Sequence, residues 1–184
     1  MVRKSRKANP AKFSPTGLWS RLILVNKMKS IALDPLRCNG CRECETACSV
    51  RRTGLNNPAW SCIRVIGKEG TEGFWFPVLC MQCSDPPCLK ACPAEALFRD
   101  EGDRVMIRYD RCIGCRMCLV ACPFGAMGFD MDFGRSFKCD LCGGNPECVR
   151  VCEPKALHYL DKTEMGLDRA LHFSRSLVEA ERGR

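Results

Sequence analysis

The chain has 184 residues, 17 of them cysteine and 2 histidine, and its formal net charge is +8 at pH 7. A chain of this length can bury a modest apolar core in one or two small domains, but its cysteine content indicates that thiol chemistry organises the fold. No apolar signal segment opens the sequence, and the longest early apolar run, Leu22 to Val25, is too short to cross a bilayer. We therefore expect a cytoplasmic protein without a membrane span, in which reduced thiols bind metal rather than form disulfides.

The two ends of the chain differ from its cysteine-rich middle. Residues 1–30 form a basic arm, since eight Lys or Arg and no acidic residue precede Asp34. A solvated tail is expected there; docking on an acidic partner is the alternative, and nucleic acid is not expected because no recognition motif accompanies the charge. Residues 161–184 predict a helical tail, because apolar side chains recur there at helical spacing (Leu167, Ala170, Leu171 and Val178).

Sixteen of the cysteines fall into four groups of four. The first and third groups are spaced C-x2-C-x2-C-x3-C, and the second and fourth lengthen the middle gap to four and five residues. The segments from the third cysteine onward resemble one another, as in "CLKACPAEAL" and "CLVACPFGAM", so we expect a repeated unit of ligand loop, short helix, turn and strand. Strands are predicted within residues 61–67 and 104–110. The groups are Cys38, Cys41, Cys44, Cys48; Cys80, Cys83, Cys88, Cys92; Cys112, Cys115, Cys118, Cys122; and Cys139, Cys142, Cys148, Cys152.

This spacing is typical of iron–sulfur cubanes. A C-x2-C-x2-C run can wrap around a compact inorganic core, whereas tetrahedral zinc is usually bound by two close pairs that a long loop separates. A zinc-stabilised interaction protein without redox activity is the alternative. On a helix, the fourth cysteine would lie about 6 Å further along the axis than the third, which directs it towards a neighbouring cluster. In two-cluster ferredoxins the last cysteine of the motif does ligate the other cluster, and the proline after it, here Pro93 or Pro123, helps to turn the chain away.

The order of the four motifs carries a family resemblance. The motifs "CNGCRECETAC", "CMQCSDPPCLKACPAEAL", "CIGCRMCLVACPFGAM" and "CDLCGGNPECVRVCEPKAL" follow one another within residues 36–160. In this order they resemble the four-cluster ferredoxin-like electron-transfer subunits of molybdenum and tungsten oxidoreductases, hydrogenases and carbon monoxide dehydrogenase. The resemblance implies an α+β fold of two nested bacterial-ferredoxin-like units, four 4Fe-4S clusters, and the relay of single electrons by a subunit that is not itself catalytic.

The same resemblance implies which groups share ligands. Residues 31–79 and 132–160 would form an outer unit from the first and fourth groups, and residues 80–131 an inner unit from the second and third. Each cluster would take three cysteines of one group and the last cysteine of its partner group. The implied sets are Cys38, Cys41, Cys44 with Cys152; Cys139, Cys142, Cys148 with Cys48; Cys80, Cys83, Cys88 with Cys122; and Cys112, Cys115, Cys118 with Cys92.

A catalytic partner is also implied. The favoured partner is a tungsten or molybdenum enzyme of the aldehyde oxidoreductase type, or a relative that reduces aromatic thioesters, with a flavoprotein or a ferredoxin at the other end of the path. A cytoplasmic hydrogenase or carbon monoxide dehydrogenase is the alternative partner.

The residues around the cysteines give three further expectations. The seventeenth cysteine, Cys62, is expected to be a small buried side chain in a strand, with a reactive thiol as the alternative. Basic residues near the ligands are placed to raise individual reduction potentials (Arg42, Arg111, Arg116, Lys138 and Arg150). Apolar neighbours of the third group are expected to exclude water from it (Ile113, Leu119, Val120 and Phe124).

Overall fold

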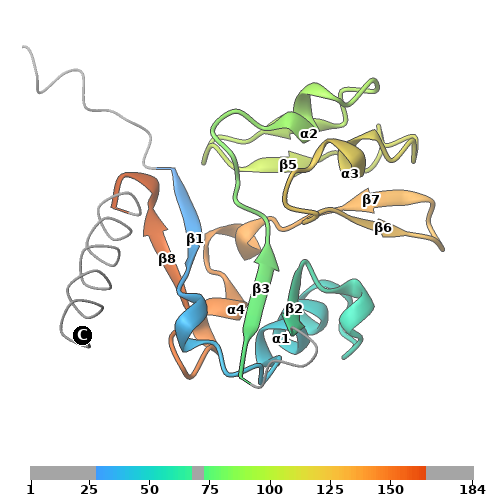
Figure 1. Ribbon diagram of the computed structural model, residues 1–184. Helices are drawn as coiled ribbons and strands as arrows, with labels where there is room; N and C mark the ends of the chain where they lie inside the picture. Colours follow the sequence, from blue (N-terminus) through green and yellow to red (C-terminus); the bar gives the residue numbers. More distant parts are fainter. Residues whose placement is uncertain (1–27, 68–72, 165–184) are drawn as a thin grey trace, which may run out of the picture.

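The strands of the described residues form four separate two-stranded antiparallel sheets. This computed structural model describes residues 28–67 and 73–164 (Figure 1), so most of the predicted basic arm and of the predicted helical tail lies outside the described residues. The strands are β1 (Lys29–Leu33), β2 (Ile63–Gly67), β3 (Trp75–Leu79), β4 (Leu97–Arg99), β5 (Val105–Ile107), β6 (Gly128–Asp130), β7 (Arg135–Phe137) and β8 (Leu157–Asp161). The α-helices are α1 (Glu43–Thr53), α2 (Pro87–Lys90), α3 (Met117–Ala121) and α4 (Glu147–Arg150).

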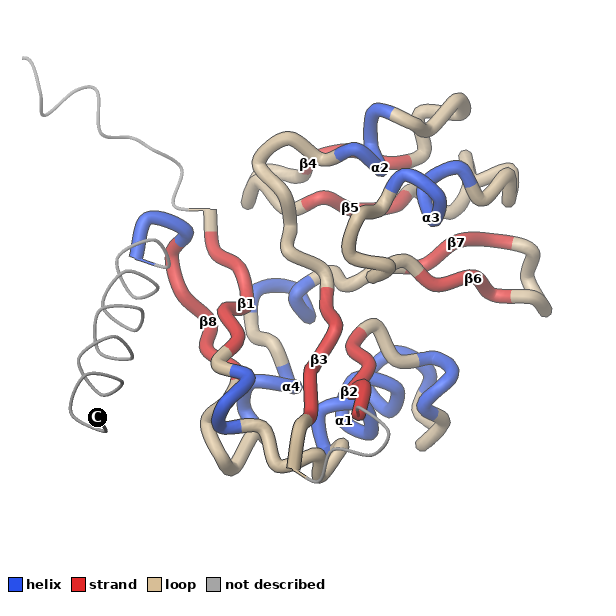
Figure 2. The backbone as a smooth tube through the Cα atoms, in the orientation of Figure 1, coloured by secondary structure: helices blue, strands red, loops and turns tan. Residues whose placement is uncertain are grey.

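These elements gather into two groups that lie side by side (Figures 1 and 2). In the first group β1 pairs with β8, with Leu33 opposite Leu157, while α1 packs against α4 and against the β2–β3 hairpin. In the second group α2 packs against α3, accompanied by the hairpins β4–β5 and β6–β7. The chain leaves the first group through β3 and returns to it after β7. The result is a small mixed fold of helices and strands, in agreement with the α+β class.

A helix begins just before the third cysteine of every group, as the repeat predicts. Helix α1 is the longest, because acidic residues in its first turn and basic residues in its last turn complement the helix dipole, and Gly54 ends it at φ 76°. The other helices last about one turn. The expectation that the fourth cysteine lies on the helix is right for Cys48 and wrong for Cys92, Cys122 and Cys152, which follow the helix ends. At Cys122 the reason is Pro123, since the residue before a proline avoids helical ψ, and Cys122 has ψ 111°.

Both apolar cores contain cysteine side chains. The larger core packs thiols of the first and fourth groups among aliphatic side chains from β1, β2, β3 and β8, and the smaller core packs thiols of the second and third groups against Leu97, Val105 and Met127. A buried carboxylate orients α1 on the larger core, because Glu45 accepts a hydrogen bond from the backbone N–H of Val65 at 2.6 Å. The cysteines therefore lie inside the fold and are part of what holds it together.

Gln82 links the two cores, and its loss is expected to destabilise the fold. Its side chain is 2% exposed; it accepts a hydrogen bond from the N–H of Val105 at 2.8 Å and donates one to the carbonyl oxygen of Cys139 at 2.9 Å. Gln82→Met would leave the buried N–H of Val105 without a partner, worth about 1 to 3 kcal/mol, whereas the carbonyl oxygen of Cys139 keeps the hydrogen bond from Lys138 Nζ at 2.9 Å. We expect the unfolding free energy of the metal-loaded chain to fall by about 1 to 3 kcal/mol, measured as a lower denaturant midpoint. An unchanged midpoint would contradict this role.

In the part of the chain that the structure describes, no helix has the length and apolar character needed to span a bilayer.

Candidate metal-cluster sites

The ligand loops have a tightly curled backbone that depends on glycine. Gly114 has φ 70°, and a Cβ there would lie 2.2 Å from the carbonyl oxygen of Gly134. Gly40 in the first group has φ 74°, and a Cβ there would lie 2.4 Å from the ring of Trp75. Backbone turns with left-handed residues form the concavities that bind anions and iron–sulfur centres, because successive N–H groups converge in them. The sequence therefore fixes loops suited to an anionic cluster.

Three cavities each bring together three cysteines of one group and the last cysteine of another. The largest has a volume of about 280 Å³ and lies in the first group of elements. Its cysteines include the complete fourth-group triplet and the last cysteine of the first group. The same exchange recurs in two smaller cavities of the second group of elements. The sets are Cys139, Cys142, Cys148 with Cys48; Cys112, Cys115, Cys118 with Cys92; and Cys80, Cys83, Cys88 with Cys122.

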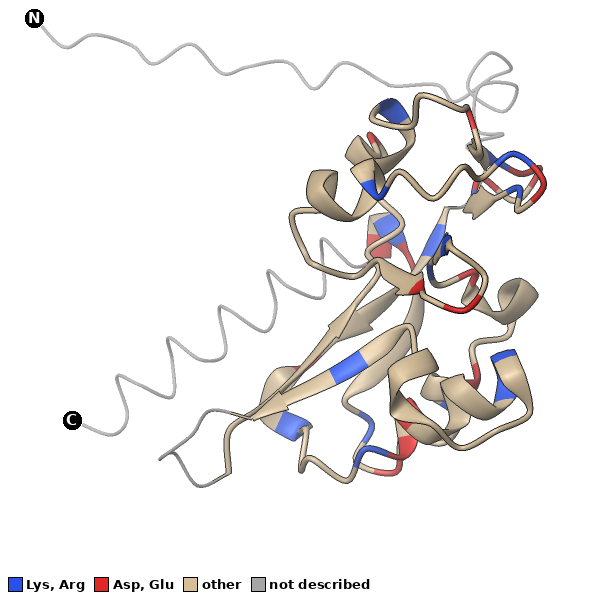
Figure 3. Cartoon of the chain, turned by 90° about the vertical axis from the view of Figure 1, so that its right-hand side faces the viewer, with Lys and Arg blue, Asp and Glu red and all other residues tan. Residues whose placement is uncertain are grey.

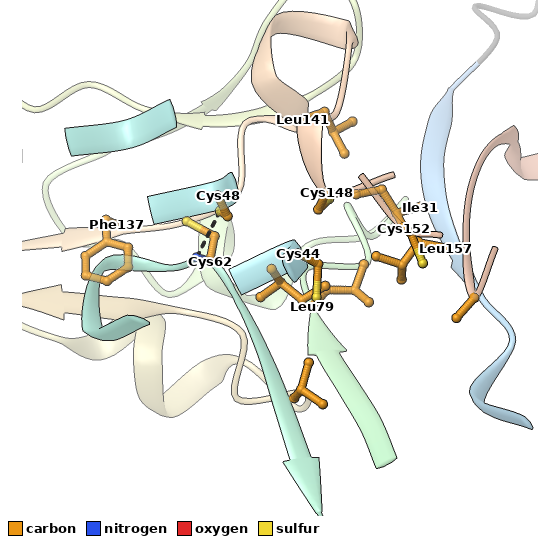
Figure 4. Packing of buried hydrophobic residues seen from close by; sticks show 13 residues of the cluster. Ile31, Cys44, Cys48, Cys62, Leu79, Phe137, Leu141, Cys148, Cys152 and Leu157 are labelled. Carbon is orange, nitrogen blue, oxygen red and sulfur yellow. Dashed lines mark hydrogen bonds between the residues drawn. The ribbon is translucent and has the colours of Figure 1, made fainter. Parts of the chain in front are cut away.

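Three cysteines of the remaining set belong to the larger core, whereas the fourth, Cys41, is exposed. Cys44 and Cys152 are buried in that core, and Cys38 packs against it; Figure 4 shows Cys44, Cys48, Cys148 and Cys152 among the apolar side chains. Burial, the Glu45 carboxylate, and then the thiols of Cys152 and Cys41 raise the pKa of Cys44 to about 12. Cys41 and Cys152 therefore lie close enough to Cys44 for their charges to raise its pKa.

The donor sets suit an iron–sulfur cluster, because each of the three cavities is lined by the four thiols of one set. Across residues 28–67 and 73–164, no three His, Cys, Asp or Glu side chains lie close enough to share one metal ion. Zinc would need four ligand atoms about 2.0 to 2.3 Å from one centre, whereas a cubane separates its thiolates over four iron corners. Backbone N–H groups also donate to sulfur, from Cys62 to Cys48 at 3.3 Å and from Ala96 to Cys92 at 3.3 Å. Such bonds stabilise thiolate ligands.

Most of the buried thiols need a metal before they lose their protons. Burial raises the pKa of Cys88 to about 11 and that of Cys148 to about 12. Cys48 differs, since hydrogen bonds from the side chain and backbone of Cys62 outweigh burial and lower its pKa to about 6. Only thiolates bind iron, so loading the other thiols releases protons to solvent.

Two of the sixteen cysteines in the four groups, Cys41 and Cys115, are exposed. The expectation that apolar neighbours shield the third group is wrong for Ile113, Val120 and Phe124, which are 69%, 83% and 47% exposed, whereas Leu119 packs against the smaller core. Figure 3, which colours the chain by residue type, shows basic and acidic residues interspersed among the described residues.

Two residues beside Cys48 were not predicted as part of a site. Cys62 is buried, as expected, but its N–H donates to the Cys48 sulfur (Figure 4). Arg52 lines the 280 Å³ cavity, and its guanidinium lies 4.4 Å from the ring centroid of Phe137. A sequence signal for Arg52 exists, since it follows Cys48 by four residues and so lies on the same face of α1.

Comparisons with known proteins agree with the site. The chain matches the 4Fe-4S dicluster domain model over residues 71–162 and a 4Fe-4S binding domain model over residues 35–51. It is 42% identical over 123 residues to the polyferredoxin-like subunit of an aliphatic sulfonate oxidoreductase from Pyrococcus furiosus, a match that covers 66% of this chain and 70% of the relative.

Two further similarities extend to other oxidoreductases. The chain is 41% identical over 134 residues to the beta subunit of NADH-dependent phenylglyoxylate dehydrogenase from Aromatoleum evansii, a match that covers 71% of this chain but only 30% of that longer relative. A chain in the solved active site complex of benzoyl coenzyme A reductase with benzoyl-CoA is 28% identical, over 85% of this chain and 97% of that one. The TM-score there is 0.43. The family matches and the identity to the Pyrococcus subunit confirm that the chain belongs to the 4Fe-4S dicluster family, which includes the electron-transfer iron–sulfur subunits of oxidoreductases, and that it binds 4Fe-4S clusters.

Proposed function

We propose that this chain relays single electrons through four 4Fe-4S clusters between a catalytic oxidoreductase subunit and a second redox protein. The observation that carries the proposal is the exchange of last cysteines in three cavities, each lined by three thiols of one group and one thiol of another. The proposed ligands are the sixteen cysteines in the four sets that the family resemblance implies. Each bound cluster supplies one-electron chemistry, while the chain holds it, positions it and limits its contact with water.

Two nested ferredoxin-like units are part of the proposal. Residues 31–79 and 132–160 would form the outer unit, which is supported by the pairing of β1 with β8 and by the packing of α1 on α4. Residues 80–131 would form the inner unit, supported by the packing of α2 on α3. Nesting gives each unit two clusters that exchange a ligand, so that neighbouring clusters stay close together.

The exposed cysteines suggest where electrons enter and leave. Cys41 and Cys115 are the exposed members of two different proposed ligand sets, one in each group of elements. Between these ends, burial and then the Cys80 thiol raise the pKa of Cys139, which supports an arrangement with the two interior sets beside each other. We infer an electron path that runs between the cluster of Cys41 and the cluster of Cys115 through the two interior clusters. The exposed apolar side chains around Cys115 suit a surface that a partner covers.

The partner belongs to the same proposal. The named relatives are subunits of oxidoreductases, which supports a catalytic oxidoreductase partner for this chain. Within that class we favour a tungsten or molybdenum enzyme of the aldehyde oxidoreductase type, or a relative that reduces aromatic thioesters, in the cytoplasm. A flavoprotein or a ferredoxin would serve the other end, and a hydrogenase or carbon monoxide dehydrogenase is the second candidate. Metal analysis of the complex that copurifies with the chain tests this choice, since molybdenum or tungsten would be present only in the favoured case.

Cluster content tests the proposed relay directly. The chain isolated without oxygen is expected to be brown and to contain about sixteen irons and sixteen acid-labile sulfides, four of each per cubane. Cys62→Ser provides a matched control, since Cys62 lies outside the four groups and its replacement should leave the iron content unchanged. A colourless chain that contains zinc would overturn the relay in favour of a structural zinc protein.

A further inference from the structure

The largest cavity contains more than cysteine thiols. Besides Cys48 and the fourth-group triplet, it is lined by the side chains of Arg52 and Cys62. The inference below rests on the proposed function, because it takes Cys48, Cys139, Cys142 and Cys148 as the ligands of one cluster. Its subject is how the two additional residues act on that cluster.

Arg52 places a positive charge beside Cys48. Its guanidinium stacks at 4.4 Å from the ring centroid of Phe137, which fixes the plane of the fork. Its Nε atom is buried and meets no hydrogen-bond acceptor among the described residues. A buried donor on a charged group is costly unless something accepts from it. A cluster with thiolate ligands is anionic and would supply that acceptor inside the same cavity.

The other charged and titratable groups of the cavity form hydrogen bonds, stack on aromatic rings or are exposed to solvent. Asp130 accepts the N–H groups of Asp132 and Phe133, both at 3.0 Å, and so closes the β6–β7 turn. Arg135 stacks at 4.7 Å from the ring centroids of both Tyr109 and Phe133. The remaining groups are Tyr109, which hydrogen-bonds Arg52; Asp140, which accepts the N–H of Cys142 at 2.9 Å; and Arg51, which is exposed. Among the described cations lining the cavity, Arg52 is therefore the best placed to act on Cys48.

Cys62 adds hydrogen-bond donors on the same side. Its backbone N–H donates to the Cys48 sulfur at 3.3 Å, and its thiol lines the cavity and is 7% exposed. Hydrogen bonds to a ligating sulfur, like a nearby cation, favour the more negative state of a cluster. The cluster gains one negative charge when it accepts an electron from a reductant, so both residues favour reduction.

We propose that Arg52 and Cys62 are positioning residues that raise the reduction potential of the cluster ligated by Cys48, Cys139, Cys142 and Cys148, relative to the same cluster without them. An electron on the path would then be held longer at this interior position.

The test is a redox titration of the iron-loaded full chain, followed by electron paramagnetic resonance. Arg52→Gln should lower the reduction equilibrium constant of one cluster about tenfold, which equals about 59 mV for a one-electron couple. Arg52→Lys keeps the charge and should recover at least half of that shift. Cys62→Ala, which keeps the backbone N–H and removes only the thiol, should shift the same cluster in the same direction, and Cys62→Ser, which replaces the thiol by a hydroxyl donor, should shift it less. The affected cluster is identified as the one whose signal changes in Cys142→Ser.

Arg108→Gln is the matched control. It removes an arginine that also stacks on a ring, at 4.3 Å from the centroid of Phe98, but that is exposed and outside the cavity. This variant should shift no single cluster. The inference is overturned if Arg52→Gln, with wild-type iron content, leaves all four potentials unchanged or shifts a cluster other than the one that Cys142→Ser marks. Failure of the proposed function is distinguishable, because the wild-type chain itself would then not contain four clusters in the iron and sulfide analysis.

Discussion

Replacing Cys122 by serine is expected to damage the cluster of the second cysteine group and to spare that of its own group. The Cys122 thiol lines the cavity of Cys80, Cys83 and Cys88, and it is absent from the lining of the cavity that contains the other third-group thiols. The backbone at Cys122 is extended, with ψ 111°, and ends α3. The Cys122 side chain therefore lines the cavity of the second group. We expect the loss of up to about four irons, or conversion of one cluster to a three-iron form, which iron analysis and electron paramagnetic resonance would detect.

Cys118→Ser is the matched variant for this experiment. Cys118 is four residues earlier and lines the cavity of its own group, so its replacement should damage the other cluster of the pair. The two variants should therefore alter different signals. If both altered the same signal, the exchange of ligands between the second and third groups would be wrong.

Removing the iron is expected to unfold most of the protein. Among the described residues, three of the four α-helices have four or five residues, and four of the eight strands have three. Isolated helices shorter than about 12 residues are marginal in water, so packing must hold these elements in place. Their packing partners include the ligand thiols themselves, which form part of both cores. Where a metal site forms only in the folded chain, the free energy of metal binding contributes to folding.

The measurement is circular dichroism and hydrogen exchange before and after chelation without oxygen. We expect the cooperative unfolding transition and the slow-exchanging amides to disappear, and iron with sulfide to restore them. Zinc added instead should not restore them, since tetrahedral zinc needs four ligand atoms around one centre, whereas a cubane separates its thiolates over four iron corners. An iron-free chain that still unfolds cooperatively would show that apolar packing is sufficient.

The sequence predicts the cysteine groups and the helix starts well because both are local. Four cysteines at fixed spacing define each loop, and the helix begins beside the third cysteine in all four repeats. The strand predictions at 61–67 and 104–110 are confirmed by β2 and β5, although β5 is only three residues long. The expected position of the fourth cysteine was wrong wherever the helix stops early.

Long-range features were missed for physical reasons. Strands as short as β4, β6 and β7 contain too few residues to show an alternating pattern. Nothing local in β1 identifies β8 as its partner. Arg52 was overlooked because its importance depends on Phe137 and on a cavity built from distant segments. The shielding predicted for Val120 failed because an apolar side chain is buried only where another element covers it, and α3 leaves it 83% exposed.

The pairing of β1 with β8 imposes an order on biosynthesis. The ribosome makes β1 long before β8, and at about 5 to 20 residues per second the interval is on the order of ten seconds. Until α4 is made, α1 holds its thiols without α4 beside it, whereas the segment that contains α2 and α3 is complete before α4 begins. The second and third cysteine groups can therefore receive their iron while translation continues. The first group must wait for the final strand, so a chain that stalls before Leu157 would leave its thiols open to oxidation or to the wrong metal.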